Sequence, residues 1–279
     1  MTPTALDAYL ARIGLAGGRG PTPDLLATLA LAHAQAIPFE NLAVLSTGAP
    51  DLSPDTVQTK LVDRRRGGYC YEHNTLLQAA LQALGFDVVG LSARVRHGVP
   101  QDVATPRSHM VLLVRLQDRP LLVDGGFGSL TLTAPVCLDV EGPQPTPHEA
   151  VRAVPVAADE FELQALVGGT WTALYRFDLV RQLPVDYVQQ NWHTATRPGA
   201  LFAHNLVVAR PGAKGRHVLF NRTLTRRHAD GRAERRTIGS ADDLRQVLRE
   251  VFGLEPDTAD LAQAWDVSGR GQPPHAAFG

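Results

Sequence analysis

The 279-residue sequence predicts an α+β fold, with a helical N-terminal third, a central antiparallel sheet or barrel, and helices again near the C-terminus. Up to Gly85, apolar residues recur every three or four positions, as in amphipathic helices. From Phe86 onward, short alternating or β-branched segments are separated by Gly, Pro and Asp, as in antiparallel sheets. The helical period returns after Ser240.

Four helices are expected in the N-terminal third. The first two cover residues 5–13 and 23–37, and the third begins at Pro54 with Ser53 as its N-cap. The fourth follows Cys70 and ends at Gly85, with leucine and alanine side chains along one face. Cys70 is therefore predicted to lie at a helix N-terminus.

The remaining elements are predicted from the spacing of apolar residues and from the Gly, Pro and Asp residues between segments. Strands are expected over residues 88–97, 109–116, 120–127, 161–166, 171–177, 205–210 and 217–227. A helix capped by Ser240 and ended by Gly253 should follow, with a further helix over 258–265. The Pro-rich residues 141–150 are predicted to form a surface loop, and Cys137 to lie in a loop. The tail from Ser268 is predicted to be disordered.

Composition limits the classes of function. The formal charge of −1, with 44% hydrophobic and 20% charged residues, does not favour nucleic acid as a partner. The first residues lack a basic start followed by an apolar stretch, and no run of about 18 apolar residues occurs, so we expect a cytoplasmic protein without membrane association. The two cysteines provide no disulfide framework, which leaves a reactive thiol possible.

The segment "RRRGGYCYEHN", residues 64–74, places Cys70 after two glycines. A helix N-terminus and a nearby imidazolium can lower the pKa of a cysteine thiol from about 8.5 to roughly 3.5–7.5, and the thiolate is the nucleophile. The alternative is a buried structural cysteine, since free cysteines are often buried. Gly67 and Gly68 fit either a substrate approaching the thiol or a tight turn.

A nucleophilic thiol needs a base, and the sequence has ten histidines. His109 is distinguished from the others by its place in a predicted hairpin. A two-residue turn at Gln117-Asp118 would pair the flanking strands so that Asp124 lies diagonal to His109 on the same face. Diagonal neighbours are about 7–8 Å apart at the backbone, within reach of a carboxylate and an imidazole. A three-residue turn would place the two residues on opposite faces. The alternatives are a solvated strand histidine and a turn-forming aspartate.

The segments "IPFENL", "RRGGYCYEHN", "SHMVLLV" and "LLVDGGFG" together resemble the arylamine N-acetyltransferases. The resemblance extends from Ile37 to Leu224. It implies a helical bundle carrying the nucleophile over residues 1–85, an antiparallel β-barrel carrying the histidine and aspartate over 86–190, and an α/β lid over 191–279. The family's catalytic triad, a cysteine-protease-like Cys-His-Asp core, falls on Cys70, His109 and Asp124. In the family's "P-x-S-x-F" segment, this chain has Ala200 in place of the serine.

The resemblance also implies ping-pong acetyl transfer from acetyl-CoA as co-substrate, through an acetyl-cysteine, to an aromatic amine or hydrazine, with no metal. Acceptor-pocket positions fall on Phe39, Phe127 and Phe202, giving apolar ring contact with no placed charge for an ammonium or a carboxylate. Coenzyme A positions fall on Ser108, Gly125, Gly126 and Gly128. The alternative for the three phenylalanines is core packing, and the alternative for the glycines is the end of a glycine-rich hairpin.

Other interpretations remain open. The same order of cysteine, histidine and aspartate occurs in papain-like proteases and transglutaminases, and amide synthases that close aromatic polyketides resemble the same family. Glu72 and Asn74 could brace the helix start, and we favour that role for Glu72. The arginines at 64–66 and between 210 and 227 either bind phosphates or are solvated. No nucleotide-binding loop and no metal-ligand spacing is present.

Overall fold

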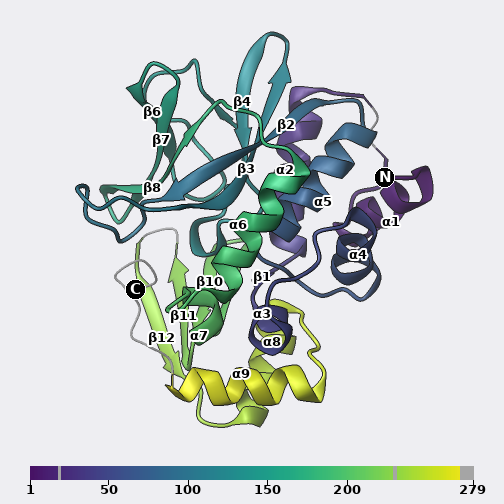
Figure 1. The fold of residues 1–279 in the computed structure, drawn as a ribbon, viewed down its shortest axis with the longest axis vertical. Coiled ribbons are helices and arrows are strands. Elements are labelled where there is room, and N and C mark those ends of the chain that lie inside the picture. Colours follow the sequence, from purple (N-terminus) through teal and green to yellow (C-terminus); the bar gives the residue numbers. More distant parts are fainter. Residues whose placement is uncertain (18–19, 229–230, 271–279) are drawn as a thin grey trace.

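The computed structural model describes residues 1–17, 20–228 and 231–270, and it shows an α+β fold built around two antiparallel sheets (Figure 1). Its N-terminal part is helical, as predicted, and α5 packs against β2 and β3 of the larger sheet. The elements of this part are α1 (Pro3–Arg12), α2 (Pro23–Ala36), β1 (Phe39–Glu40), α3 (Leu42–Thr47), α4 (Pro54–Gln58), the π-helical turn η1 (Thr59–Asp63) and α5 (Cys70–Ala83).

Seven strands form the larger sheet in the order β5-β4-β3-β2-β8-β7-β6. Its two edge strands approach each other, so the sheet curls into a nearly closed barrel. Its elements are β2 (Asp87–Val95), β3 (Arg107–Leu116), β4 (Arg119–Val123), the 3₁₀ turn η2 (Gly128–Leu130), β5 (Val136–Cys137), β6 (Val151–Ala157), β7 (Glu160–Val167) and β8 (Thr170–Asp178).

The hairpin between β3 and β4 has the predicted two-residue turn. Gln117 and Asp118 both have positive φ, 53° and 61°, as a type I′ turn requires. Leu116 pairs with Arg119, and the register continues to Leu112 opposite Val123. Because this register is fixed, the residues that follow β4 return beside the start of β3, where His109 lies.

The smaller sheet has the order β1-β9-β10-β11-β12 and carries α8 on β9. Phe39 and Glu40 of the N-terminal part form its first strand, paired with β9. The remaining elements are α6 (Pro184–Thr196), α7 (Leu201–His204), β9 (Val207–Gly212), β10 (Gly215–Phe220), β11 (Thr223–His228), β12 (Ala233–Thr237), α8 (Ala241–Phe252) and α9 (Thr258–Arg270).

Several local expectations differ from the structure. Ser53 does not cap α4 with its side chain, because its hydroxyl bonds to Asp51 and Thr56 instead. Cys137 lies in the short strand β5 and is buried. Helix α9 continues to Arg270, so the tail begins later than Ser268, and residues 271–279 lie outside the described residues.

Helix α6 and strands β6 and β12 were not expected. Pro155 interrupts the apolar pattern of β6, and β12 is exposed throughout and polar after Ala233, so neither has the usual alternation. The expected boundary between residues 190 and 191 falls within α6.

A buried ion pair joins the barrel to the smaller sheet. Arg216 of β10 contacts both carboxylate oxygens of Glu149, at 2.6 and 2.9 Å, and donates to the carbonyl of Thr131 after η2. Beside it, His148 bridges Thr133 and the carbonyl of Gly212. The Pro-rich loop is therefore part of the contact between the two sheets.

We expect Arg216→Met to lower the free energy of unfolding by about 3 kcal/mol, because it leaves the Glu149 carboxylate without its partner. Urea denaturation measures this. Arg119→Met is the matched control, since Arg119 pairs with Asp139 at an exposed site, and it should leave the unfolding midpoint unchanged. Equal effects of the two substitutions would contradict this assignment.

Candidate active site

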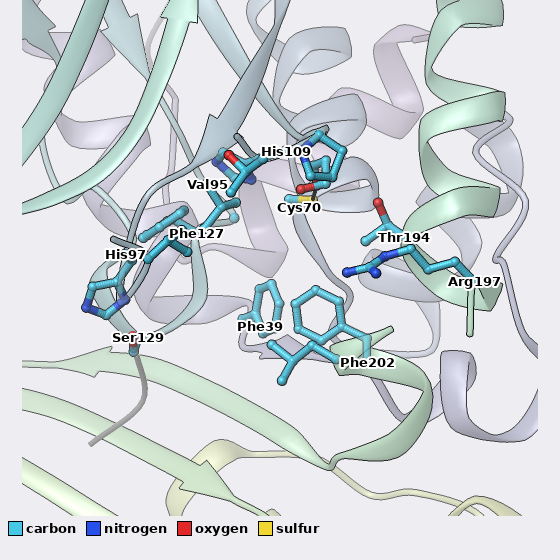
Figure 2. A pocket seen from close by; sticks show the side chains of 16 residues that line it. Phe39, Cys70, Val95, His97, His109, Phe127, Ser129, Thr194, Arg197 and Phe202 are labelled. Carbon is cyan, nitrogen blue, oxygen red and sulfur yellow. Dashed lines mark hydrogen bonds between the residues drawn. The ribbon is translucent and has the colours of Figure 1, made fainter. Parts of the chain in front are cut away.

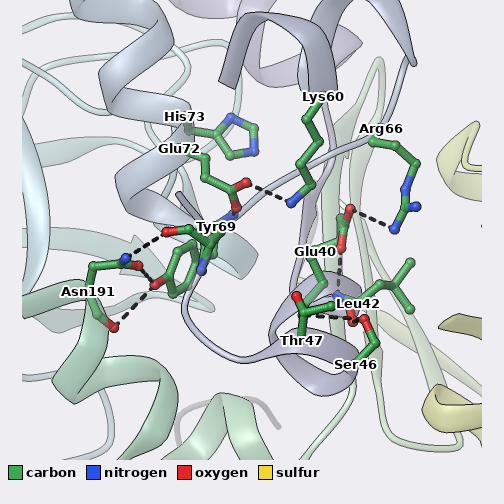
Figure 3. Close-up of polar contacts among 12 residues, drawn as sticks. Glu40, Leu42, Ser46, Thr47, Lys60, Arg66, Tyr69, Glu72, His73 and Asn191 are labelled. Atoms are coloured by element: carbon green, nitrogen blue, oxygen red, sulfur yellow. Dashed lines mark hydrogen bonds and ion pairs between the residues drawn. The ribbon is translucent and has the colours of Figure 1, made fainter. Parts of the chain in front are cut away.

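Cys70 is the first residue of α5, as predicted, and the segment around it is held by hydrogen bonds and close backbone packing. Glu72 accepts a hydrogen bond from the backbone N–H of Tyr69 and forms an ion pair with Lys60 at 2.7 Å, which confirms its structural role (Figure 3). A side chain at Gly67 would lie 2.2 Å from the carbonyl oxygen of Pro38, and one at Gly68 would meet Glu72. The two glycines therefore permit close backbone packing and do not line the cavity described below.

The hairpin brings His109 and Asp124 together. Nε2 of His109 lies 2.7 Å from Oδ2 of Asp124, and both side chains are buried. The other ring nitrogen is left to face Cys70, whose sulfur lies 4.0 Å from the carbonyl oxygen of Ser108. Figure 2 shows the Cys70 and His109 side chains next to each other. The predicted pairing is confirmed, and the three residues form a Cys-His-Asp constellation.

The electrostatics of this group favour an imidazolium. Burial alone would lower the pKa of His109, but the charge of Asp124, its hydrogen bond and Cys70 outweigh burial and raise that pKa to about 10. Burial would likewise raise the pKa of Asp124, and the charge of His109 with the surrounding hydrogen bonds lowers it. The site therefore holds a positive charge beside the sulfur at neutral pH.

Asn74 joins the helix to the aspartate, a role that sequence reasoning missed. Its amide nitrogen donates to Asp124 and to the carbonyl of Met110, and its oxygen accepts from the N–H of Gly125. The N–H of Gly126 donates to the same carboxylate oxygen at 2.9 Å. Asp124 is thus held by both the hairpin and α5.

The glycines after Asp124 allow this loop to lie against the helix. A side chain at Gly125 would meet His33 at 2.8 Å, and one at Gly126 would lie 2.8 Å from the Cα of Cys70. Gly128 has a positive φ of 79°. Close packing explains Gly125 and Gly126, and Gly126 and Ser108 also line the cavity, so a contact of this loop with coenzyme A stays a prediction.

A chain of buried hydrogen bonds lies behind the loop. The Pro38 carbonyl only accepts, so His73 donates to it through Nε2, and His73 Nδ1 then accepts from His33 at 2.9 Å. His33 in turn accepts from the Tyr9 hydroxyl at 3.0 Å. Burial lowers the pKa of both histidines, that of His73 to about 4, so both are neutral. This directional chain supports the backbone around Pro38.

A cavity of about 250 Å³ opens onto Cys70 and His109 (Figure 2). Phe39, Phe127 and Phe202, the three positions that the family resemblance implied, all line it. The rings of Phe39 and Phe202 are 5.7 Å apart, and Phe127 packs edge-on against His109 at 5.1 Å. The cavity wall is therefore largely apolar, with three phenylalanine rings close to the thiol and the imidazole.

Residues before and beside Cys70 position the other walls. Asn41 donates to the carbonyls of Phe202 and Asn205 and accepts from the N–H of Val207, which places Phe202 beside Phe39. The Tyr69 hydroxyl donates to the side chain of Asn191 on α6 (Figure 3). These contacts hold α6 against the start of α5, although no local pattern in the sequence signalled them.

Arg197, at the end of α6, overturns the expectation that the pocket has no placed charge. Its side chain lines the cavity, and Figure 2 shows the guanidinium directed inward between Thr194 and Phe202. His97 lines the opposite side, and burial together with the charge of Arg227 lowers its pKa to about 4. Tyr175, also missed, packs its ring 5.0 Å from that of His109.

Four of the arginines that suggested phosphate binding have protein partners. Arg66 pairs with Asp260 and Arg216 with Glu149. Arg210 donates to the last carbonyls of α8, and Arg222 lies 3.7 Å from the Trp265 ring centre. Within the described ranges, no cluster of histidine, cysteine and carboxylate side chains could hold a metal. Within the same ranges, every helix is too short or too polar to cross a membrane.

Comparison with known proteins agrees with this geometry. A family model described as N-acetyltransferase matches residues 23–261. The arylamine N-acetyltransferase of Mycolicibacterium smegmatis is 41% identical over 92% of this chain and 94% of its own length. The chain belongs to the arylamine N-acetyltransferase family. The Escherichia coli family member is 38% identical over 93% of this chain and 92% of its own length.

Solved structures of arylamine N-acetyltransferases have the same fold. That of Salmonella typhimurium superposes with a TM-score of 0.88 at 37% identity, covering 95% of this chain and 99% of its own. That of Mycobacterium marinum, in complex with CoA, has a TM-score of 0.89 at 36% identity and covers 94% and 99%. The α+β fold expected from the sequence is thus confirmed.

The raised pKa of His109 predicts how Cys70 reacts with iodoacetamide. Because the imidazolium persists from pH 6 to pH 8, we expect the alkylation rates at these two pH values to agree within about threefold, whereas an ordinary thiol slows by nearly two orders of magnitude. Peptide mapping of timed samples gives the rate at each cysteine.

Cys137 serves as the internal control. Burial and the hydrogen bond that its thiol donates to Asp139 raise its pKa, so it should stay unmodified at pH 6. Asp124→Asn removes the charge that supports the imidazolium and should make alkylation of Cys70 steeply pH-dependent. An equally steep dependence in the unaltered protein would contradict a persistent imidazolium beside Cys70.

Proposed function

We propose that this protein transfers an acetyl group from acetyl-CoA to an aromatic amine or arylhydrazine, through an acetyl-cysteine at Cys70. The observation that carries the proposal is the Cys70–His109–Asp124 constellation facing an aromatic cavity of about 250 Å³. Support comes from the relatives named arylamine N-acetyltransferases and from the M. marinum structure in complex with CoA. The reaction needs no metal.

In the first half-reaction, the Cys70 thiolate attacks the thioester carbonyl of acetyl-CoA, and the bond from the carbonyl carbon to the CoA sulfur breaks. The His109 imidazolium donates its proton to the departing sulfur and becomes neutral. Asp124 keeps the imidazole in one orientation and stabilises its charged form. The products are acetyl-Cys70 and CoA.

In the second half-reaction, the amine nitrogen attacks acetyl-Cys70 while neutral His109 accepts a proton from it. The amide leaves, and the Cys70 thiolate and the imidazolium are restored. The amine must react unprotonated. Anilines and hydrazides are largely neutral at pH 7, whereas an alkylamine with a pKa near 10.4 is almost fully charged.

Incubation with acetyl-CoA in the absence of an acceptor should add one acetyl group to the intact mass, located on Cys70 by peptide mapping. Cys137 is the control, because its raised pKa disfavours the thiolate. Cys70→Ala should abolish the mass change and Cys137→Ala should leave it complete. Acetylation at Cys137 alone would contradict the assignment of Cys70 as the nucleophile.

Adding an acceptor then tests the second half-reaction. Anilines and hydrazides should return the acetyl-enzyme to its original mass much faster than alkylamines at equal concentration. Rapid loss of the acetyl group to water alone would instead favour a cysteine hydrolase. No acetylation by acetyl-CoA would favour a different acyl donor, such as the carrier-bound chain of an amide synthase.

Phe127 is expected to contact the acceptor ring, since it lines the cavity beside His109. Phe127→Ala should raise the acceptor KM about tenfold, corresponding to a ring contact of roughly 1–2 kcal/mol, and leave acceptor-free acetylation of Cys70 intact. Phe161→Ala is the matched control, because Phe161 stacks on Phe177 in the barrel and does not line the cavity. Equal slowing of both half-reactions would assign Phe127 to packing.

A further inference from the structure

Arg197 differs from the other charged groups around the cavity. Of the residues that line it, Arg197 alone carries a permanent charge, since the others are apolar, hydroxyl-bearing, histidine, cysteine or glycine residues. It is exposed, and within the described part of the chain its side chain has no hydrogen bond or ion pair. The positive charge therefore faces the cavity without a protein counter-charge.

Neighbouring arginines show the contrast. Arg94 donates to the carbonyl of Thr105, Arg96 to those of Val103 and Pro100, and Arg107 pairs with Asp178. These three guanidinium groups stabilise the strands and loop beside the cavity. Arg197 has no such structural task, because the backbone ends α6 through its own N–H bond to His193.

The electrostatics of the cavity suit an anion. Asp124 is buried behind His109, to which it is hydrogen-bonded, and no carboxylate lies among the residues that line the cavity. On the far side, the charge of Arg227 helps to keep His97 neutral. In the proposed acetyl-enzyme, the form that binds the acceptor, Cys70 carries no charge, so an anionic acceptor would meet one guanidinium and no negative charge among the lining residues.

We propose that Arg197 binds the carboxylate of the acceptor, so that preferred acceptors are aromatic amines with an acidic ring substituent, as in the aminobenzoates. This inference rests on the proposed acetyl transfer. The aromatic ring lies among Phe39, Phe127 and Phe202, the amine faces Cys70, and the carboxylate accepts hydrogen bonds from the guanidinium. The planar guanidinium fork matches a carboxylate, and its five donors are free for it.

A phosphate of coenzyme A could offer Arg197 the same kind of partner, and the two half-reactions distinguish the sources. The test compares 3- and 4-aminobenzoate with the corresponding aminobenzamides, which have the same shape and no charge. The unaltered protein should have a lower KM for the acid than for the amide. Equal KM values would overturn the proposal whatever the variants do.

Arg197→Met should lower kcat/KM for the aminobenzoate about tenfold and leave the value for the aminobenzamide within about twofold. Arg197→Lys should retain part of the discrimination, since it keeps the charge but loses the fork. Arg181→Met, an exposed arginine before α6 and outside the cavity, should change neither value.

Acetylation of Cys70 by acetyl-CoA without acceptor is measured in parallel and should be unchanged in Arg197→Met. A loss of this step, with the ratio of acid to amide preserved, would assign Arg197 to a CoA phosphate and overturn the proposal. If the unaltered protein acetylated Cys70 and accepted aniline without discriminating acid from amide, only the role of Arg197 would fail. If Cys70 were not acetylated, the proposed function itself would fail.

Discussion

A buried carboxylate dominates the design of this site. Asp124 is 1% exposed, and a charge removed from water is tolerated only where nearby groups pair with it. His109, Asn74 and the N–H of Gly126 provide that pairing from β3, from α5 and from the loop itself. The helix with the nucleophile and the barrel with the base are thereby fixed to one another by the same charge.

The parts of the site that depend on local geometry were predictable. The turn at Gln117-Asp118 fixes the hairpin register, and the register alone brings Asp124 to His109. The helix start at Cys70 follows from the apolar period after it. In both cases, the determining residues lie within about fifteen positions of the residue that they place.

Tertiary contacts placed the rest, and no local pattern reports them. Arg197 lines the cavity because Tyr69 anchors α6 through Asn191. Helix α6 exposes three of its large apolar side chains, those of Val185, Val188 and Trp192. The spacing of apolar residues in its sequence therefore did not indicate which face is buried. The sequence left two roles open for the glycines at 67 and 68, and their contacts with Pro38 and Glu72 favour close backbone packing.

The hydrogen bonds from Asn41 to Phe202 and Asn205 also bear on how the protein is made. These partners are separated by more than 160 positions. At a synthesis rate of about 5–20 residues per second, the first emerges from the ribosome roughly 10 to 30 seconds before the second. For most of that interval Cys70 is already present while Arg197 and Phe202, which complete the cavity, are missing. The nascent chain thus contains its nucleophile before the cavity around that nucleophile is complete.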